Sequence, residues 1–189
     1  MKKGTIIIIA IVAVVLLLIG SVIGSYNGFV TEEEKVKKAQ SDISTQLQRR
    51  ADLIPNFVET VKGYSDYEKE TYTAVTEARN AVKSANTVTE QAEASAQLDS
   101  AIDIWVNAVT EAYPELKASE QYIGLQDELA GTENRIAQAR RDYNDTVNKF
   151  NSRVKKFPGS IVAGMFGFDA FDYFEADSNS LSTPQVSFD

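Results

Sequence analysis

The chain has 189 residues, of which 27 are acidic and 19 are basic, and it contains neither cysteine nor histidine. Those absences exclude disulfide bonds, thiol nucleophiles, Ser-His-Asp triads and zinc sites built on imidazole or thiolate. The net charge of −8 at pH 7 argues against nucleic acid as a partner. We therefore expect a protein that is not an enzyme and that needs no metal or other cofactor.

The first element is an uncharged run over residues 4–30, in which Thr5 to Ile23 is almost entirely Ile, Val, Leu and Ala. A helix needs roughly 20 apolar residues to cross the hydrocarbon core of a bilayer. A cleaved signal peptide is the alternative, but its apolar core is about 7–15 residues long and ends in a small-x-small site. We favour an uncleaved, single-pass anchor, so that residues 1–30 form an N-terminal tip and a transmembrane segment with the lipid bilayer as a partner.

The orientation of this span depends on the positive charges around it, because basic residues are retained on the cytoplasmic side. Lys2 and Lys3 directly precede the span, whereas three lysines between residues 35 and 38 follow it at a greater distance. We expect the N-terminal tip in the cytoplasm, the chain in the cell membrane, and the domain that follows the span outside the cytoplasm.

Three glycines recur at every fourth position near the end of the span: Gly20, Gly24 and Gly28. A face of small residues lets two membrane helices approach closely, which makes Gly20 and Gly24 candidate packing residues of a homo-oligomer. Glycine is also common in spans generally. The alternative is a loosened helix without a dimer, and the sequence leaves both readings open.

Residues 31–157 show four amphipathic segments joined by short connections. Patterns typical of a capping box begin the first three, at Thr31, Ser65 and Thr87, and the last segment runs from about Ser119 to Phe157. Pro55 predicts a kink or a break in the first segment. Because no strand pattern is present, we predict an all-α fold: an N-terminal transmembrane helix followed by an up-and-down antiparallel bundle of about four long helices.

The apolar positions follow the helical period and predict the core of this bundle. They include Val36, Ile43, Leu47, Ile54 and Val58 in the first segment, Val75, Ala78 and Val82 in the second, Leu98, Ile102, Trp105 and Val109 in the third, and Ile136, Tyr143, Val147 and Phe150 in the fourth.

Residues 158–175 form an aromatic C-terminal cap, and residues 176–189 form a polar tail that we expect to be flexible. The aromatic segment either folds back over the end of the bundle or exposes a patch to a partner or to the membrane interface. Its candidate partner-binding residues are Phe166, Phe168, Tyr173 and Phe174.

Charged residues interrupt the first bundle segment at Arg49, Arg50 and Asp52, beside Pro55. One hypothesis is that Arg50 or Asp52 pairs with a charge on a facing helix and fixes the register of the bundle. The expected partners are charged residues of the last segment, Glu133, Arg135, Arg140, Arg141 and Asp142. The other hypothesis is a groove at Pro55 in which the arginines bind a carboxylate of a partner.

The stretch QLQRRADLIPNFVETVKGY over residues 46–64 resembles the LemA family of bacterial membrane proteins. The resemblance continues at Tyr26-Asn27, at Ala78-Arg79, at TENRI over residues 132–136, at ARRDYN over residues 139–144, at Phe157-Pro158, at Phe166-Gly167-Phe168 and at YFEA over residues 173–176. It implies a single N-terminal span and a helical bundle. The family has no established enzymatic activity, and a relative associated with magnetosome membrane formation implies, by analogy, a membrane-organising role.

The leading hypothesis is therefore a membrane-anchored, non-enzymatic scaffold or adaptor that presents its bundle to other membrane or envelope proteins or to the membrane surface. The alternative is a sensory or signalling accessory protein that binds a small ligand or peptide between its helices.

Overall fold

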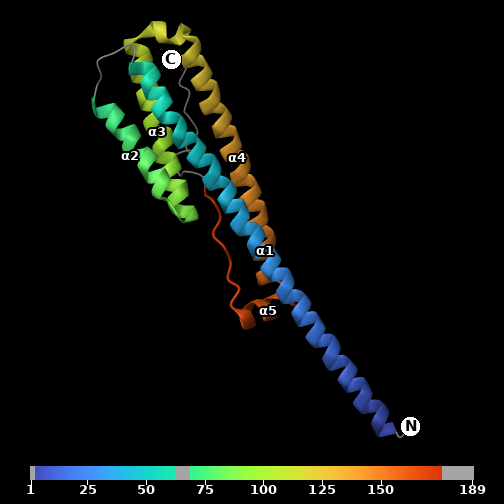
Figure 1. Ribbon diagram of the computed structural model, residues 1–189. Helices are drawn as coiled ribbons and strands as arrows, with labels where there is room; N and C mark the ends of the chain where they lie inside the picture. Colours follow the sequence, from blue (N-terminus) through green and yellow to red (C-terminus); the bar gives the residue numbers. More distant parts are fainter. Residues whose placement is uncertain (1–2, 63–68, 176–189) are drawn as a thin grey trace, which may run out of the picture. The chain divides into compact units, whose positions relative to one another are not determined.

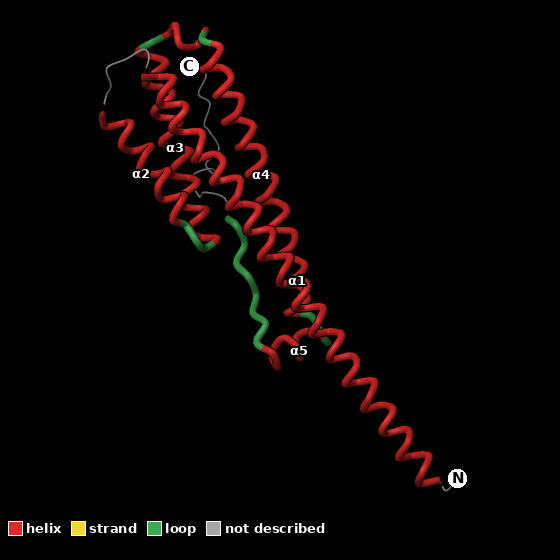
Figure 2. The backbone as a smooth tube through the Cα atoms, in the orientation of Figure 1, coloured by secondary structure: helices red, strands yellow, loops and turns green. Residues whose placement is uncertain are grey.

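The structure, a computed structural model, describes residues 3–62 and 69–175, with side chains left out over residues 61–72. Its helices are α1 (Lys3–Lys62), α2 (Lys69–Ser84), α3 (Val88–Ala112), α4 (Glu120–Lys155) and α5 (Gly159–Phe166), with a short 3₁₀ helix, η1 (Pro114–Ala118), before α4. Among the described residues there is no strand (Figures 1 and 2). The predicted capping box at Ser65 and the predicted tail lie outside the described residues.

Helix α1 is continuous through the apolar run and the first bundle segment. The helix start predicted at Thr31 is therefore wrong: the Thr31 hydroxyl donates to the carbonyl oxygen of Asn27 at 2.8 Å, a bond made inside a helix. The acidic residues that follow form pairs on the helix surface, since Lys37 lies 3.0 Å from both Glu33 and Glu34. Pro55 was predicted to cause a kink or a break, and the break is wrong, because α1 continues to Lys62. The kink stays a prediction.

Contacts divide the chain into two units, which we describe separately. Unit 1 comprises Met1–Ala39 and Asp145–Asp172, and unit 2 comprises Gln40–Asn144 and Tyr173–Asp189. The division falls within α1 and within α4. The domain boundaries predicted after residues 30, 157 and 175 stay a prediction.

Unit 2 is an up-and-down helical bundle, as predicted. Contacts from Arg49 to Glu128 and from Phe57 to Tyr122 show that α1 and α4 are antiparallel, because the residue number rises on one helix as it falls on the other. Helix α3 runs parallel to α1, as contacts from Ser44 to Gln91 and from Phe57 to Trp105 show. Helix α2 packs on α3 and contacts α1 through Lys83, which pairs with Asp52 at 2.9 Å.

The core of unit 2 follows the predicted apolar stripes. Its fully buried side chains include the predicted residues Ile43, Leu47, Leu98, Trp105, Ile136 and Tyr143, and also Phe57, Leu116 and Tyr122, which those stripes did not contain. The predicted capping box at Thr87 is confirmed: the Thr87 hydroxyl accepts from the Glu90 amide, and the Glu90 carboxylate accepts from the Thr87 amide at 3.0 Å. This reciprocal pair satisfies free amides at the start of α3.

Unit 1 packs the C-terminal part of α4 against α1. Phe29 and Phe150 meet edge to face at 5.9 Å, and both are buried. The Arg153 guanidinium lies 4.5 Å above the Phe29 ring, donates to Glu32 at 3.0 Å, and donates to the Ser25 carbonyl oxygen at 3.1 Å. A Cβ at Gly28 would collide with this guanidinium, so that the glycine makes room for the arginine to cross α1.

Helix α5 follows α4 after a tight turn. Gly159 is required there, because a Cβ would collide with the Arg153 carbonyl oxygen. The helix ends at Gly167, whose φ of 75° is left-handed and whose amide, like that of Phe168, donates to the Ala163 carbonyl oxygen.

The residues after α5 lie along α4 without regular secondary structure, and asparagine side chains hold them. In unit 1 the Asn151 amide group donates to the Phe171 carbonyl oxygen at 2.8 Å and accepts from the Phe171 amide at 2.9 Å. In unit 2 the Asn144 side chain makes the same pair of bonds to Phe174, at 2.9 and 2.8 Å. The aromatic segment thus folds back on the helices, although several of its side chains stay exposed.

Candidate functional site

A buried ionic cluster in unit 2 is centred on Arg50 of α1, whose side chain is 8 % exposed. Its guanidinium forms ion pairs with Asp99 of α3 and with Glu133 of α4. The pairing of Arg50 with Glu133 is one of the two arrangements expected from the sequence. Because one cation bridges carboxylates on two different helices, it fixes how α1, α3 and α4 align along one another.

Arg140 of α4 adds a second cation to this cluster. Its guanidinium donates to the Ser95 hydroxyl at 2.7 Å and lies 4.7 Å above the ring of Phe174, which is itself buried. Burial lowers the pKa of Arg140, while Glu133 and Asp99 oppose this effect. Phe174 is therefore held by a cation–π contact on its ring and by Asn144 on its backbone.

Asp99 is the titratable group of the cluster. Burial raises its pKa to about 6, with a further contribution from the negative charge of Glu133 and a smaller one from Asp103. The positive charges of Arg50 and Arg140 act in the opposite direction. The carboxyl group can therefore gain or lose a proton close to neutral pH, which an ordinary aspartate cannot.

A cavity of about 510 Å³ opens beside this cluster, between α3, α4 and the segment after Tyr173. Its charged lining is mainly acidic, with Asp99, Asp103, Glu133 and Glu175 against the single cation Arg140. In the part of the chain that the structure describes, no group of three or more acidic residues is arranged to hold a metal ion. The cavity could accept a cationic group, since carboxylates outnumber arginine in its walls.

Arg49 and Asp52, the other charged candidates that the sequence suggested beside Arg50, lie on the surface. Arg49 pairs with Glu128 at 3.6 Å, and Asp52 pairs with Lys83 at 2.9 Å. The hydrogen bond from Lys83, followed by one from Gln48, lowers the pKa of Asp52. Pro55 is exposed within α1. Both arginines thus have carboxylate partners within the chain, and a partner-binding role for these residues stays a prediction.

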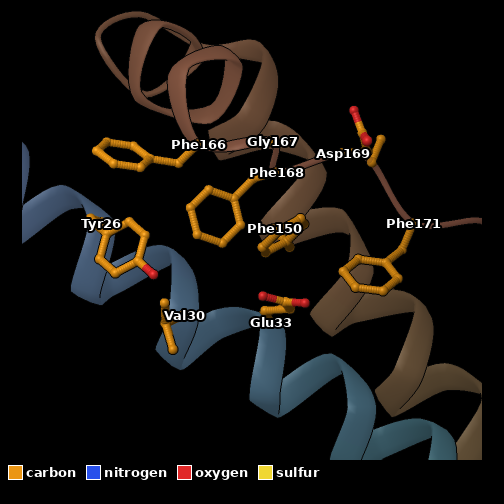
Figure 3. A pocket seen from close by; sticks show the side chains of 10 residues that line it. Tyr26, Val30, Glu33, Phe150, Phe166, Gly167, Phe168, Asp169 and Phe171 are labelled. Atoms are coloured by element: carbon orange, nitrogen blue, oxygen red, sulfur yellow. The ribbon is translucent and has the colours of Figure 1, made fainter.

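An aromatic cavity of about 550 Å³ lies in unit 1 (Figure 3). Tyr26 meets Phe166 at 4.9 Å and Phe168 at 5.6 Å between ring centres, and Phe168 also stacks on Phe29 at 5.0 Å. Phe150 and Phe171 close the other side, with a ring separation of 5.1 Å. Glu33 and Asp169 supply the charged groups of the lining. The structure thus brings Phe166 and Phe168 together, while in unit 2 Tyr173 is exposed and Phe174 is buried.

The apolar part of α1 is not covered by any part of the chain that the structure describes. Its large side chains from Ile6 to Ile19, together with Ile23, are exposed, and a Cβ at Gly20 or Gly24 would meet no atom within 4 Å. The helix is long and apolar enough to cross a membrane, which indicates a membrane location. Packing of Gly20 and Gly24 against a second helix stays a prediction.

The comparisons with known proteins agree with this architecture. The LemA family model matches residues 39–188, a range that contains the whole ionic cluster and the aromatic C-terminal segment. The chain belongs to the LemA family. The resemblance expected from the sequence is therefore confirmed.

Individual relatives are similar over most of the chain. Protein LemA of Metamycoplasma hominis is 29 % identical over 142 residues, which cover 75 % of this chain but only 64 % of the relative, less than two thirds of its length. Magnetosome protein MamQ 2 of Paramagnetospirillum magneticum is 25 % identical over 207 residues, covering 95 % of this chain and 76 % of the relative. Magnetosome protein MamQ of Magnetospirillum gryphiswaldense is 23 % identical over 189 residues, covering 85 % and 70 %.

Several residues that build these sites were not predicted from the sequence, namely Asp99, Asn144, Asn151 and Arg153. Each stands next to, or near, an apolar stripe and looks like part of a solvated face. A usable signal was the seven-residue spacing of Asn144 and Asn151, each directly after a buried aromatic residue of the stripe, Tyr143 or Phe150. That spacing places both amides on one side of α4.

Proposed function

We propose that this LemA-family protein is a membrane-anchored, non-enzymatic scaffold or adaptor whose bundle contacts other membrane or envelope proteins. The observation that carries the proposal is α1, which supplies both an uncovered apolar segment and core residues of the bundle in one helix. Relatives named as magnetosome proteins support a role in a membrane-associated assembly by analogy. We propose further that the N-terminus is cytoplasmic and the bundle lies outside the cytoplasm.

The test is affinity capture of the tagged full chain after cross-linking of intact membranes, with partners identified by mass spectrometry. A scaffold should recover the same membrane or envelope proteins in independent preparations. The matched control is a chain that starts at Gly24, which keeps Ser25, Tyr26 and Phe29 of unit 1 but lacks the span, and it should lose those partners. Failure of the full chain to recover any reproducible membrane protein would contradict the proposal.

A second candidate function, that of a sensory accessory protein, rests on the cavity beside Asp99. Its acidic lining suits a cationic peptide bound between α3 and α4. Calorimetric titration of the full chain in detergent micelles with a tetralysine peptide should show saturable binding that weakens with salt and with Asp103→Asn. Absence of saturation at millimolar peptide would contradict this function and leave the scaffold proposal standing.

A further inference from the structure

Helix α5 has an outer face that none of the described residues covers. Ile161 and Met165 are 53 % and 65 % exposed, and Phe157, in the turn between α4 and α5, is 81 % exposed. The opposite side of the helix carries Gly159, Val162 and Ala163, which are buried within the chain. The helix contains no charged residue, so apolar groups lie on both sides, a pattern expected only where both sides are covered.

The position of α5 in unit 1 is close to the end of the apolar segment of α1. Its last residue, Phe166, packs against Tyr26 at 4.9 Å. Tyr26 follows the end of the apolar run, Ile23, by three residues, a rise of about 4.5 Å along the helix. The interfacial layer on each side of the hydrocarbon is roughly 5–8 Å thick. Figure 1 shows α5 beside α1 where the apolar segment ends, and the contact with Tyr26 therefore places α5 at the level of the lipid headgroups.

The charges around α5 match an anionic lipid surface. Lys155, the last residue of α4, and Lys156, which follows it, are both exposed shortly before α5 begins. Three nearby carboxylates of unit 1 are paired within the chain: Glu32 with Arg153, and Glu33 and Glu34 with Lys37. Asp169 is exposed at the aromatic cavity and keeps a negative charge near α5, so that the two lysines outnumber it there. Basic residues beside an apolar face with aromatic and aliphatic side chains are typical of elements that lie in the membrane interface.

We infer that the exposed apolar side chains of Ile161 and Met165 on α5, and of Phe157 in the turn before it, dock on the surface of the same bilayer that α1 spans. The chain then meets the membrane twice, through a span and through an interfacial helix. This inference rests on the membrane anchoring in the proposed function. It does not depend on the identity of any protein partner.

The experiment uses the full chain in vesicles of phosphatidylcholine and phosphatidylglycerol, with bimane attached to single cysteines, since the native chain has none. Nitroxide lipids labelled at the headgroup or in the middle of the acyl chain report depth. Bimane at Met165→Cys should lose at least about half of its emission with the headgroup nitroxide and less with the mid-chain nitroxide. Two matched positions are Ile19→Cys in the span and Ile104→Cys, an equally exposed isoleucine of unit 2.

The quenching pattern distinguishes failure of the docking of α5 from failure of the membrane anchor. Quenching at Ile19 by the mid-chain nitroxide, with none at Met165, would overturn the docking of α5 while the anchor stands. No quenching at Ile19 would overturn the anchor and the docking together. If Met165 were shielded from lipid nitroxides and also from iodide in water, a second copy or another protein would cover α5 and the inference would be wrong. Quenching at Met165 with none at Ile104 supports it.

Discussion

At the scale of single residues, the raised pKa of the Asp99 carboxyl group predicts how the stability of the folded chain depends on pH. Its folded pKa of about 6 lies above its ordinary value of 3.8, so the folded chain binds this proton more tightly than the unfolded chain does. Folding is therefore favoured as the pH falls through 6, and this gain is complete below about 4. Glu133, Asp103, Arg50 and Arg140 are the charged groups that influence this carboxyl.

We expect the stability of the native chain, relative to Asp99→Asn, to rise by about 1–2 kcal/mol between pH 7 and pH 4.5, because the asparagine cannot titrate. Trp105, the single tryptophan and a buried residue of unit 2, reports unfolding by its fluorescence in urea. A difference between the two proteins that stayed constant over this pH range would show that Asp99 titrates normally.

Asn151 makes a second prediction at this scale. Its side chain is buried and holds both backbone polar groups of Phe171. Asn151→Ala removes both bonds, and we expect hydrogen exchange at the Phe171 amide to accelerate by about 10-fold or more. Mass spectrometry of peptides covering residues 168–172, with the full chain in detergent micelles, measures this exchange.

The matched control is Asn144→Ala, which removes the equivalent bonds to Phe174. That variant should accelerate exchange at residues 173–175 and leave Phe171 nearly unchanged. Equal effects of both substitutions on both segments would mean that the asparagines do not hold their segments separately.

At the scale of the elements, the start of α3 supports a prediction about capping. Thr87→Ala removes the hydroxyl that accepts from the Glu90 amide, and we expect a loss of about 1 kcal/mol in the free energy of unfolding. Urea unfolding followed by Trp105 fluorescence measures it. Thr89→Ala, an exposed position of the same helix, is the control and should change stability by less than about 0.5 kcal/mol. Equal losses in both variants would argue against the cap.

The elements also show what the sequence could and could not predict. The buried stripes were predictable, because apolar residues such as Leu98, Trp105 and Ile136 follow the helical period and each must face a partner helix. The absence of a helix start at Thr31 was not predictable, because Thr31 and Thr87 begin the same capping-box pattern. Only Thr87 comes after the end of a preceding helix, whereas Thr31 lies inside α1. Whether a threonine caps depends on the backbone before it, which the pattern does not contain.

The candidate sites were predictable only in part. Arg50 was predictable as a site residue because it is a charged residue within an apolar stripe. Its partner Glu133 was among the partners expected from the sequence. Asp99 and Asn151 could not be predicted as site residues, because a polar residue beside an apolar stripe is usually solvated. Asp99 gains its buried partner only through the packing of α3, and Asn151 only through the packing of the segment after α5.

At the scale of the whole molecule, the orientation in the membrane is the prediction to test first. With single cysteines at Gly4 and at Gln97, an exposed position of α3, an impermeant thiol reagent applied to intact cells should label Gln97→Cys alone. The two positions flank the apolar segment, and the native chain contributes no background because it lacks cysteine. Labelling of Gln97→Cys only after lysis would place the bundle in the cytoplasm and reverse the proposed orientation.

The continuity of α1 links the rotation of the span to the buried residues that follow it. Ile11 and Phe29 are eighteen residues apart, which is five full turns of an α-helix, so they point in the same direction around the helix axis. Phe29 faces α4 in unit 1. The side of the span that carries Ile11 therefore points in the same direction around the helix axis as the side of α1 that packs against α4. One residue inserted between Ile23 and Phe29 would turn the span by about 100° and lengthen the helix by about 1.5 Å. The packing of Phe29 therefore determines which face of the span points toward neighbouring molecules in the bilayer.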